Sequence, residues 1–199
     1  MIIVHINYTA DADTLTHCYK GFFSQEVIDK CKPDNRGSFI ERGNLLLLNP
    51  EMKSVRNALK AYPGEALMCL GHGTPYGLFG YDCEYIIGDW CADLLKGREI
   101  IGIWCNADKF AIRHRLTGFF TSMFISNPNE ASLYHFQADE ETTQRKNIEF
   151  GNIINQLIEE NVPMGKWCSE IRERDKDILD FTDYNYKGLL FSDKEYAEA

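Results

Sequence analysis

Short apolar runs alternate along the chain with longer stretches whose apolar residues recur at helical spacing. The runs are rich in Ile, Leu and Val, as strands buried on both faces of a parallel sheet are. We expect strands at 1–7, 44–48, 65–70, 99–104 and 119–126, with 38–41 as a weaker alternative to 44–48.

Two stretches have the pattern of amphipathic helices. After 44–48, one helical face carries Met52, Val55, Leu59 and Tyr62. We expect Asn49-Pro50 to start this helix, with Asn as its cap, and Pro63-Gly64 to end it. The longest helix is expected over 139–160, where the apolar face is Phe150, Ile153, Ile154, Leu157 and Ile158.

Shorter elements complete the pattern. Residues 78–79 and 84–87 are expected to form a hairpin, followed by a short helix at 90–95 and another from Ala107. One helix near Trp167 and a final strand at 189–191 are expected at the end. The alternation predicts an α/β fold, a three-layer sandwich with a mainly parallel sheet, in one domain over 1–199.

Candidate chemistry lies where two of the expected strands end. The 65–70 strand is followed by Gly71-His72-Gly73, and the 99–104 strand by Cys105. The chain between them is long enough for the crossover that two parallel strands require. In such sheets ligands bind beyond the carboxyl ends of the strands. If the two strands are neighbours, an imidazole lies beside a thiol.

A thiol and an imidazole in this arrangement can transfer acyl groups. The thiolate of Cys105 would be the nucleophile, favoured by the start of the following helix, and His72 would accept and later donate a proton. The backbone N–H groups of Gly73 and Cys105 could form an oxyanion hole. Loop capping for His72 and core packing for Cys105 are the plainer alternatives.

This order of elements resembles the caspase-like (clan CD) cysteine peptidases, which include caspases, legumains, gingipains, separase and the CHAT-type bacterial peptidases. The similarity rests on strand–His72-Gly73, the hairpin of 77–87, a short helix and strand–Cys105, and covers roughly residues 60–130. It implies a Cys/His dyad, His72 and Cys105, that cleaves peptide bonds through a thioester acyl-enzyme. It implies no metal and no other cofactor.

Two departures from the family leave an alternative open. Trp104 stands where the family has a small residue before the nucleophile, and the caspase signature Gln-Ala-Cys is absent. The alternative is therefore a catalytically inactive, caspase-like interaction module. A nucleotide- or flavin-binding domain is a third hypothesis, but the chain has neither G-x-G-x-x-G nor a phosphate-loop motif.

Composition and net charge limit the classes of partner that we expect for the chain. The formal net charge of −9 argues against nucleic acid and anionic membranes, because phosphate binding needs clustered Lys and Arg. Seven cysteines, an odd number, and no recognisable signal segment favour a reducing cytoplasm over a disulfide framework. We expect a peptide or protein substrate, and the chain could pair with itself as a homodimer through a sheet edge.

The preferred substrate side chain is left open by the sequence. Acidic residues near the site could favour a basic side chain, and Arg113 or Arg115 an acidic one; the acidic candidates are Asp82, Asp89 and Asp108. Cys83 and Cys91 are expected to pack in the core.

Overall fold

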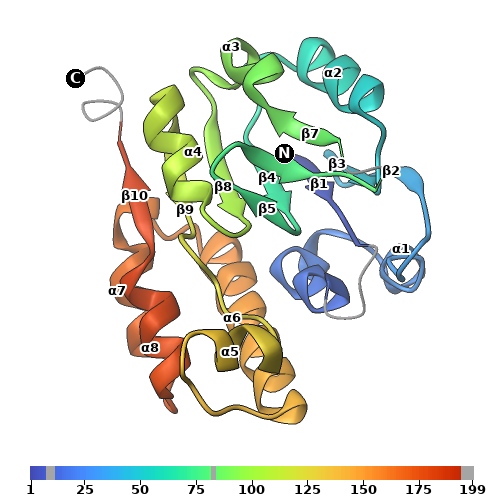
Figure 1. Ribbon diagram of the computed structural model, residues 1–199. Coiled ribbons are helices and arrows are strands. Elements are labelled where there is room, and N and C mark those ends of the chain that lie inside the picture. The colour runs from blue at the N-terminus through green and yellow to red at the C-terminus, as the bar shows by residue number, and fades with distance from the viewer. Residues whose placement is uncertain (8–11, 82–83, 194–199) are drawn as a thin grey trace.

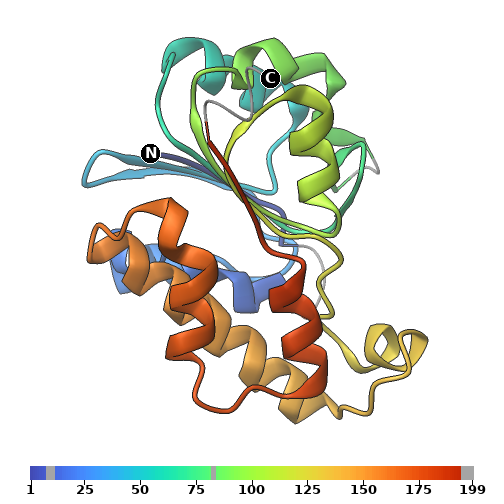
Figure 2. The ribbon, with the colours of Figure 1, turned by 90° about the vertical axis from the view of Figure 1, so that its left-hand side faces the viewer.

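The computed structural model describes residues 1–7, 12–81 and 84–193, and these form a central sheet covered by helices on both faces (Figures 1 and 2). The order of the seven strands described in this central sheet is β10-β9-β8-β4-β1-β3-β2. They are β1 (Ile2–His5), β2 (Gly37–Glu41), β3 (Asn44–Leu48), β4 (Leu67–Leu70), β8 (Glu99–Ile103), β9 (Thr117–Phe120) and β10 (Leu190–Ser192).

The five inner strands are parallel, and one antiparallel strand closes each edge. β1 pairs with β3 and β4, β4 with β8, and β8 with β9, all in parallel, whereas β2 and β10 run antiparallel to their neighbours. The predicted α/β class with a mainly parallel sheet is therefore confirmed. Both 38–41 and 44–48 are strands, because Arg42-Gly43 turns the chain back into a hairpin, with both residues at positive φ.

The helices form the two outer layers of the sandwich. Figure 2 shows the sheet nearly edge-on, with α2 to α4 on one side and α6 to α8 on the other. The helices are α1 (Gln25–Ile28), α2 (Met52–Ala61), α3 (Ala92–Leu95), α4 (Ala107–His114), α5 (Pro128–Leu133), α6 (Glu140–Glu159), α7 (Trp167–Arg174) and α8 (Asp180–Lys187). Short 3₁₀ segments are η1 (Ala12–Cys18), η2 (Lys20–Phe22), η3 (Asp89–Cys91) and η4 (Met164–Lys166).

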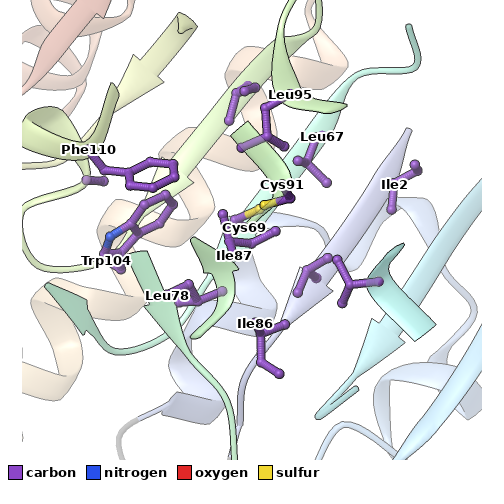
Figure 3. Packing of buried hydrophobic residues seen from close by; sticks show 14 of the residues in the cluster. Ile2, Leu67, Cys69, Leu78, Ile86, Ile87, Cys91, Leu95, Trp104 and Phe110 are labelled. Atoms are coloured by element: carbon purple, nitrogen blue, oxygen red, sulfur yellow. The ribbon is translucent and has the colours of Figure 1, made fainter. Parts of the chain in front are cut away.

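Each face of the sheet has its own apolar core. Val4, Cys69 and Ile100 pack with residues of α2, α3 and α4. Met68 and Ile103 pack on the other face with residues of η1, α6 and α7. Because successive strand residues point to opposite faces, each inner strand contributes to both cores. Figure 3 shows the first core around Cys69, Cys91 and Trp104.

A small second sheet lies between β4 and β8 in the sequence. It consists of β5 (Gly73–Thr74), β6 (Gly77–Phe79) and β7 (Tyr85–Gly88), in the order β5-β6-β7. β6 and β7 are antiparallel, which confirms the predicted hairpin. Leu78, Ile86 and Ile87 bury it against the α2–α4 core, so the hairpin covers that face beside the ends of β4 and β8.

Three local expectations need correction. Asn49 does not cap α2, because the N-cap of that helix is Glu51. The φ of Asn49 is +44°, and the buried Asn49 amide bonds to the Asn7 backbone instead. β9 ends at Phe120, and 121–126 is a loop against the site. The chain ends with two helices before β10, because the segment around Tyr186 is helical (α8). None of the described helices is both long and apolar enough to cross a bilayer.

Arg98 joins two helices to the sheet in a way that the sequence pattern did not indicate. It is 3% exposed, and its guanidinium donates to four backbone carbonyls at 2.7–2.8 Å, those of Leu59, Tyr62, Glu65 and Leu94. The carbonyls of Leu59, Tyr62 and Leu94 lie at the C-terminal ends of α2 and α3, where the helix dipole favours a cation, and that of Glu65 lies in the segment between α2 and β4.

We expect Arg98→Met to lower the free energy of unfolding by roughly 1–3 kcal/mol, because buried carbonyls lose charged donors. Urea denaturation measures this. Lys96→Met is the matched control, since Lys96 is exposed and pairs only at the surface with Asp93. Equal stability of the two variants would contradict the role of Arg98.

Candidate functional site

His72 and Cys105 follow two adjacent parallel strands at the same offset. β4 and β8 pair with Leu70 opposite Ile103, and the Gly71 N–H donates to the Ile103 carbonyl at 3.2 Å. Each site residue lies two positions beyond this last pair. Residues two apart share a face of a strand, so both side chains continue the face of Leu70 and Ile103, the α6 side.

Both side chains line one small pocket on that side of the sheet. The pocket has a volume of about 40 Å³. Its described lining residues come from η1, the ends of β4 and β8, the 121–126 loop and α6: Thr14, Leu15, Gly71, His72, Ile103, Trp104, Cys105, Phe124, Ser126, Asn147 and Phe150. His72 and Cys105 are half-buried, which leaves them accessible from outside. The structure thus brings the two predicted residues together.

Cys105 occupies a sharp turn from strand to helix. The next residue, Asn106, has φ +66°, a left-handed conformation that Asn tolerates better than most residues, and α4 begins directly after it. The Asn106 N–H donates to the Ser122 carbonyl at 2.9 Å, and the Cys105 thiol donates to the Phe124 carbonyl at 3.6 Å. The turn therefore places Cys105 near the positive end of α4 and against the 121–126 loop.

The indole of Trp104 packs into the α2–α4 core. Its indole packs 5.8 Å from the Phe110 ring in the α2–α4 core, as Figure 3 shows, and donates to the Thr74 carbonyl at 3.3 Å. Trp104 is also one of the described residues that line the pocket. The bulky residue before Cys105 is thus accommodated in the core.

Position 73 needs a glycine because the Trp104 indole leaves no room for a side chain there. A Cβ at Gly73 would lie 2.2 Å from the indole Cδ1, so a side chain there would collide with the ring. Gly73 pairs with Leu78 in the small sheet, and the carbonyl of His72 accepts from the Phe79 N–H at 2.9 Å. The hairpin therefore fixes the backbone that carries the imidazole.

The 121–126 loop is held by three buried side chains. Thr121 accepts from the Trp104 N–H at 3.1 Å and donates to its carbonyl at 2.9 Å. Asn185 bonds to both backbone groups of Ile125, at 2.8 and 3.0 Å, and Asn147 donates to the Ser126 carbonyl at 2.7 Å. These bonds hold one wall of the pocket in place.

Several pocket residues were not anticipated from the sequence. Thr14 and Leu15 belong to a segment without a clear pattern. Phe124 and Ser126 lie in a loop where a strand was expected. Asn147 carried a usable signal, because it precedes Phe150 by three positions and so places an amide on the apolar face of α6. Tyr184 of α8 also lies nearby: burial raises its pKa, and Tyr134 and Cys105 add to the effect.

Five other described cysteines are poor nucleophiles. Burial raises the pKa of the Cys18 thiol to about 12 and that of Cys91 to about 11. It raises the pKa of Cys69 well above its ordinary value, and the neighbouring Cys91 adds to this. The pKa values of Cys31 and Cys168 are also raised by burial. Because the thiolate is the reactive form, burial suppresses the reactivity of all five.

The charged residues named as specificity candidates lie elsewhere, so far as the structure describes them. The Asp89 carboxylate, which is largely exposed, accepts from Arg113 at 2.8 Å and bonds to His114 at 2.9 Å. Asp108 and Arg115 are likewise absent from the described lining of the pocket. Cys91 is buried, as expected, whereas Cys83 and Asp82 lie outside the described residues.

No three His, Cys, Asp or Glu side chains within 1–7, 12–81 and 84–193 gather as a metal site requires.

No protein-family model matches the chain, and no curated protein matches it.

Proposed function

We propose that the chain is a cysteine endopeptidase that uses His72 and Cys105 as a catalytic dyad. The observation that carries this proposal is the pairing of β4 with β8, in a register that lets the two residues follow the strands at equal offset and line one pocket. A nucleophile with an adjacent base is the arrangement that covalent acyl transfer needs.

The proposed reaction has two steps. The Cys105 sulfur attacks the scissile carbonyl carbon while His72 accepts the thiol proton, and the backbone N–H groups of Gly73 and Cys105 stabilise the oxyanion. His72 then donates the proton to the leaving amine, which gives a thioester. Water, deprotonated by His72, hydrolyses the thioester and releases the carboxylic acid with the free thiol.

Labelling of the unaltered chain tests this assignment. A peptidyl acyloxymethyl ketone reacts with a thiolate held beside a base, and mass spectrometry then identifies the modified cysteine. We expect the label on Cys105. Cys168 is the internal control, because it is also half-buried but burial raises its pKa. Iodoacetamide in urea, which alkylates all seven cysteines, shows that each can be detected.

Two outcomes would count against the proposal. A label on a cysteine other than Cys105 would refute the assignment of the nucleophile. A folded chain whose Cys105 is inert would favour the non-catalytic interaction module, and saturable binding of a protein partner would then support that alternative.

A further inference from the structure

The pocket beside His72 and Cys105 is small, and its described lining carries no carboxylate, ammonium or guanidinium. Its volume is about 40 Å³. The apolar side chains that line it are Leu15, Ile103, Phe124 and Phe150. Apart from His72 and Cys105, the described polar side chains in the lining are uncharged: Thr14, Ser126 and Asn147.

The least exposed lining residues mark the inner end of the pocket. Ile103 is 2% and Phe150 1% exposed, and both belong to the α6-side core. A substituent that enters past Cys105 thus meets hydrocarbon. An ionised group there would lose its hydration without a described partner of opposite charge, which is costly in an apolar environment.

The pocket cannot widen easily, because its walls are bonded to the core. Asn185 and Asn147 hold the 121–126 loop, as described above. The Glu130 carboxylate accepts from both the N–H and the hydroxyl of Ser126, at 2.8 and 3.1 Å, and is itself not among the described lining residues. Movement of this loop away from the pocket would strain these hydrogen bonds.

We infer that the pocket receives the side chain next to the scissile carbonyl, the P1 residue, and that the chain prefers a small uncharged P1 residue such as Ala, Ser or Val. The inference rests on the proposed function, because it needs an acyl group on Cys105. A carbonyl carbon beside the sulfur brings its own substituent to the pocket that the sulfur lines. Volume then excludes aromatic P1 residues, and desolvation excludes Asp, Glu, Lys and Arg.

Peptidyl acyloxymethyl ketones that differ only at P1 test this preference. In each reaction the Cys105 thiolate forms a C–S bond and displaces the acyloxy group as a carboxylate. The labelling rate constants of Ala, Val, Phe, Asp and Arg probes are compared on the unaltered chain. We expect the Ala and Val probes to react at least roughly tenfold faster than the other three.

Leu15→Ala provides the matched test of pocket size. Leu15 is only partly buried, so its truncation should leave the fold intact, and the larger pocket should raise the relative rate of a Leu probe by roughly tenfold. Leu133→Ala is the control, because Leu133 is 76% exposed on α5 and does not line the pocket. It should leave the order of probes unchanged.

The outcomes distinguish the inferred P1 preference from the proposed peptidase activity. Faster labelling by a Phe, Asp or Arg probe, with the label still on Cys105, overturns the inferred preference and leaves the peptidase intact. A relative rate of the Leu probe that stays unchanged in Leu15→Ala also overturns the role of this pocket. Failure of every probe to modify Cys105 overturns the proposed function, and the inference with it.

Discussion

Replacing Cys105 by Ala should abolish both peptide cleavage and labelling by an acyloxymethyl ketone. The substitution removes the sulfur that is proposed to form the thioester, so activity should fall to that of a blank. His72→Ala should lower the cleavage rate by about 10²- to 10⁴-fold, the usual contribution of a general base and acid. Both are measured with a fluorogenic peptide that carries Ala at P1.

Matched variants separate catalysis from folding. Cys168→Ala removes another half-buried thiol, and His135→Asn removes an exposed imidazole at a residue with φ +64°, a conformation that Asn tolerates. Both should retain full activity, and all four variants should keep the urea midpoint of the parent chain. Undiminished cleavage by Cys105→Ala would show that the Cys105 sulfur is not the nucleophile.

Lys146→Met should cost about 3–5 kcal/mol of the free energy of unfolding, because it leaves a buried carboxylate without its cation. The side chains of Lys146 and Asp175 are 1% and 0% exposed, and their charged atoms are 2.6 Å apart. The Tyr186 hydroxyl donates to the same carboxylate at 2.7 Å, so the three side chains join α6, the C-terminal end of α7 and α8. A typical total stability of about 5–15 kcal/mol makes this loss severe.

Arg145→Met is the matched control for this loss. Arg145 precedes Lys146 on α6, is 52% exposed, and forms a surface pair with Asp177 at 3.2 Å, so its removal should cost less than about 1 kcal/mol. The double variant Lys146→Met/Asp175→Asn should recover part of the loss, because the uncompensated charge is gone. Urea denaturation decides, and equal losses for Lys146→Met and Arg145→Met would contradict the prediction.

The Lys146–Asp175 pair makes the free energy of unfolding depend on pH. Burial alone would raise the pKa of Asp175, but hydrogen bonds from Lys146, Tyr186 and the Asp177 backbone lower it below its ordinary value. A carboxyl whose pKa is lower in the folded state stabilises the fold above its unfolded pKa, and this contribution is lost as the pH falls through the folded value. In Lys146→Met the folded-state pKa of Asp175 should rise, because burial is then opposed by fewer hydrogen bonds, so the loss of stability on acidification should be smaller than in the parent chain.

Local pattern was enough for much of the architecture. Strand 2–5, the β6–β7 hairpin and α6 follow from periodicities that a chain must satisfy wherever it buries one face. The pair His72 and Cys105 was also visible, because each stands at the end of an apolar run. Asn49 was wrongly predicted to cap α2, because its amide accepts a hydrogen bond from the backbone of Asn7, a residue far away in the chain.

The sequence alone therefore determined the α/β class, most elements and the two residues proposed for catalysis, because these depend on near neighbours. Only the tertiary structure decided that β4 lies beside β8, that Trp104 turns into the opposite core, and that Phe124, Asn147 and Phe150 line a small pocket with the pair. Strand order and pocket shape arise from contacts between segments distant along the chain, and residue spacing carries no record of which segments will meet.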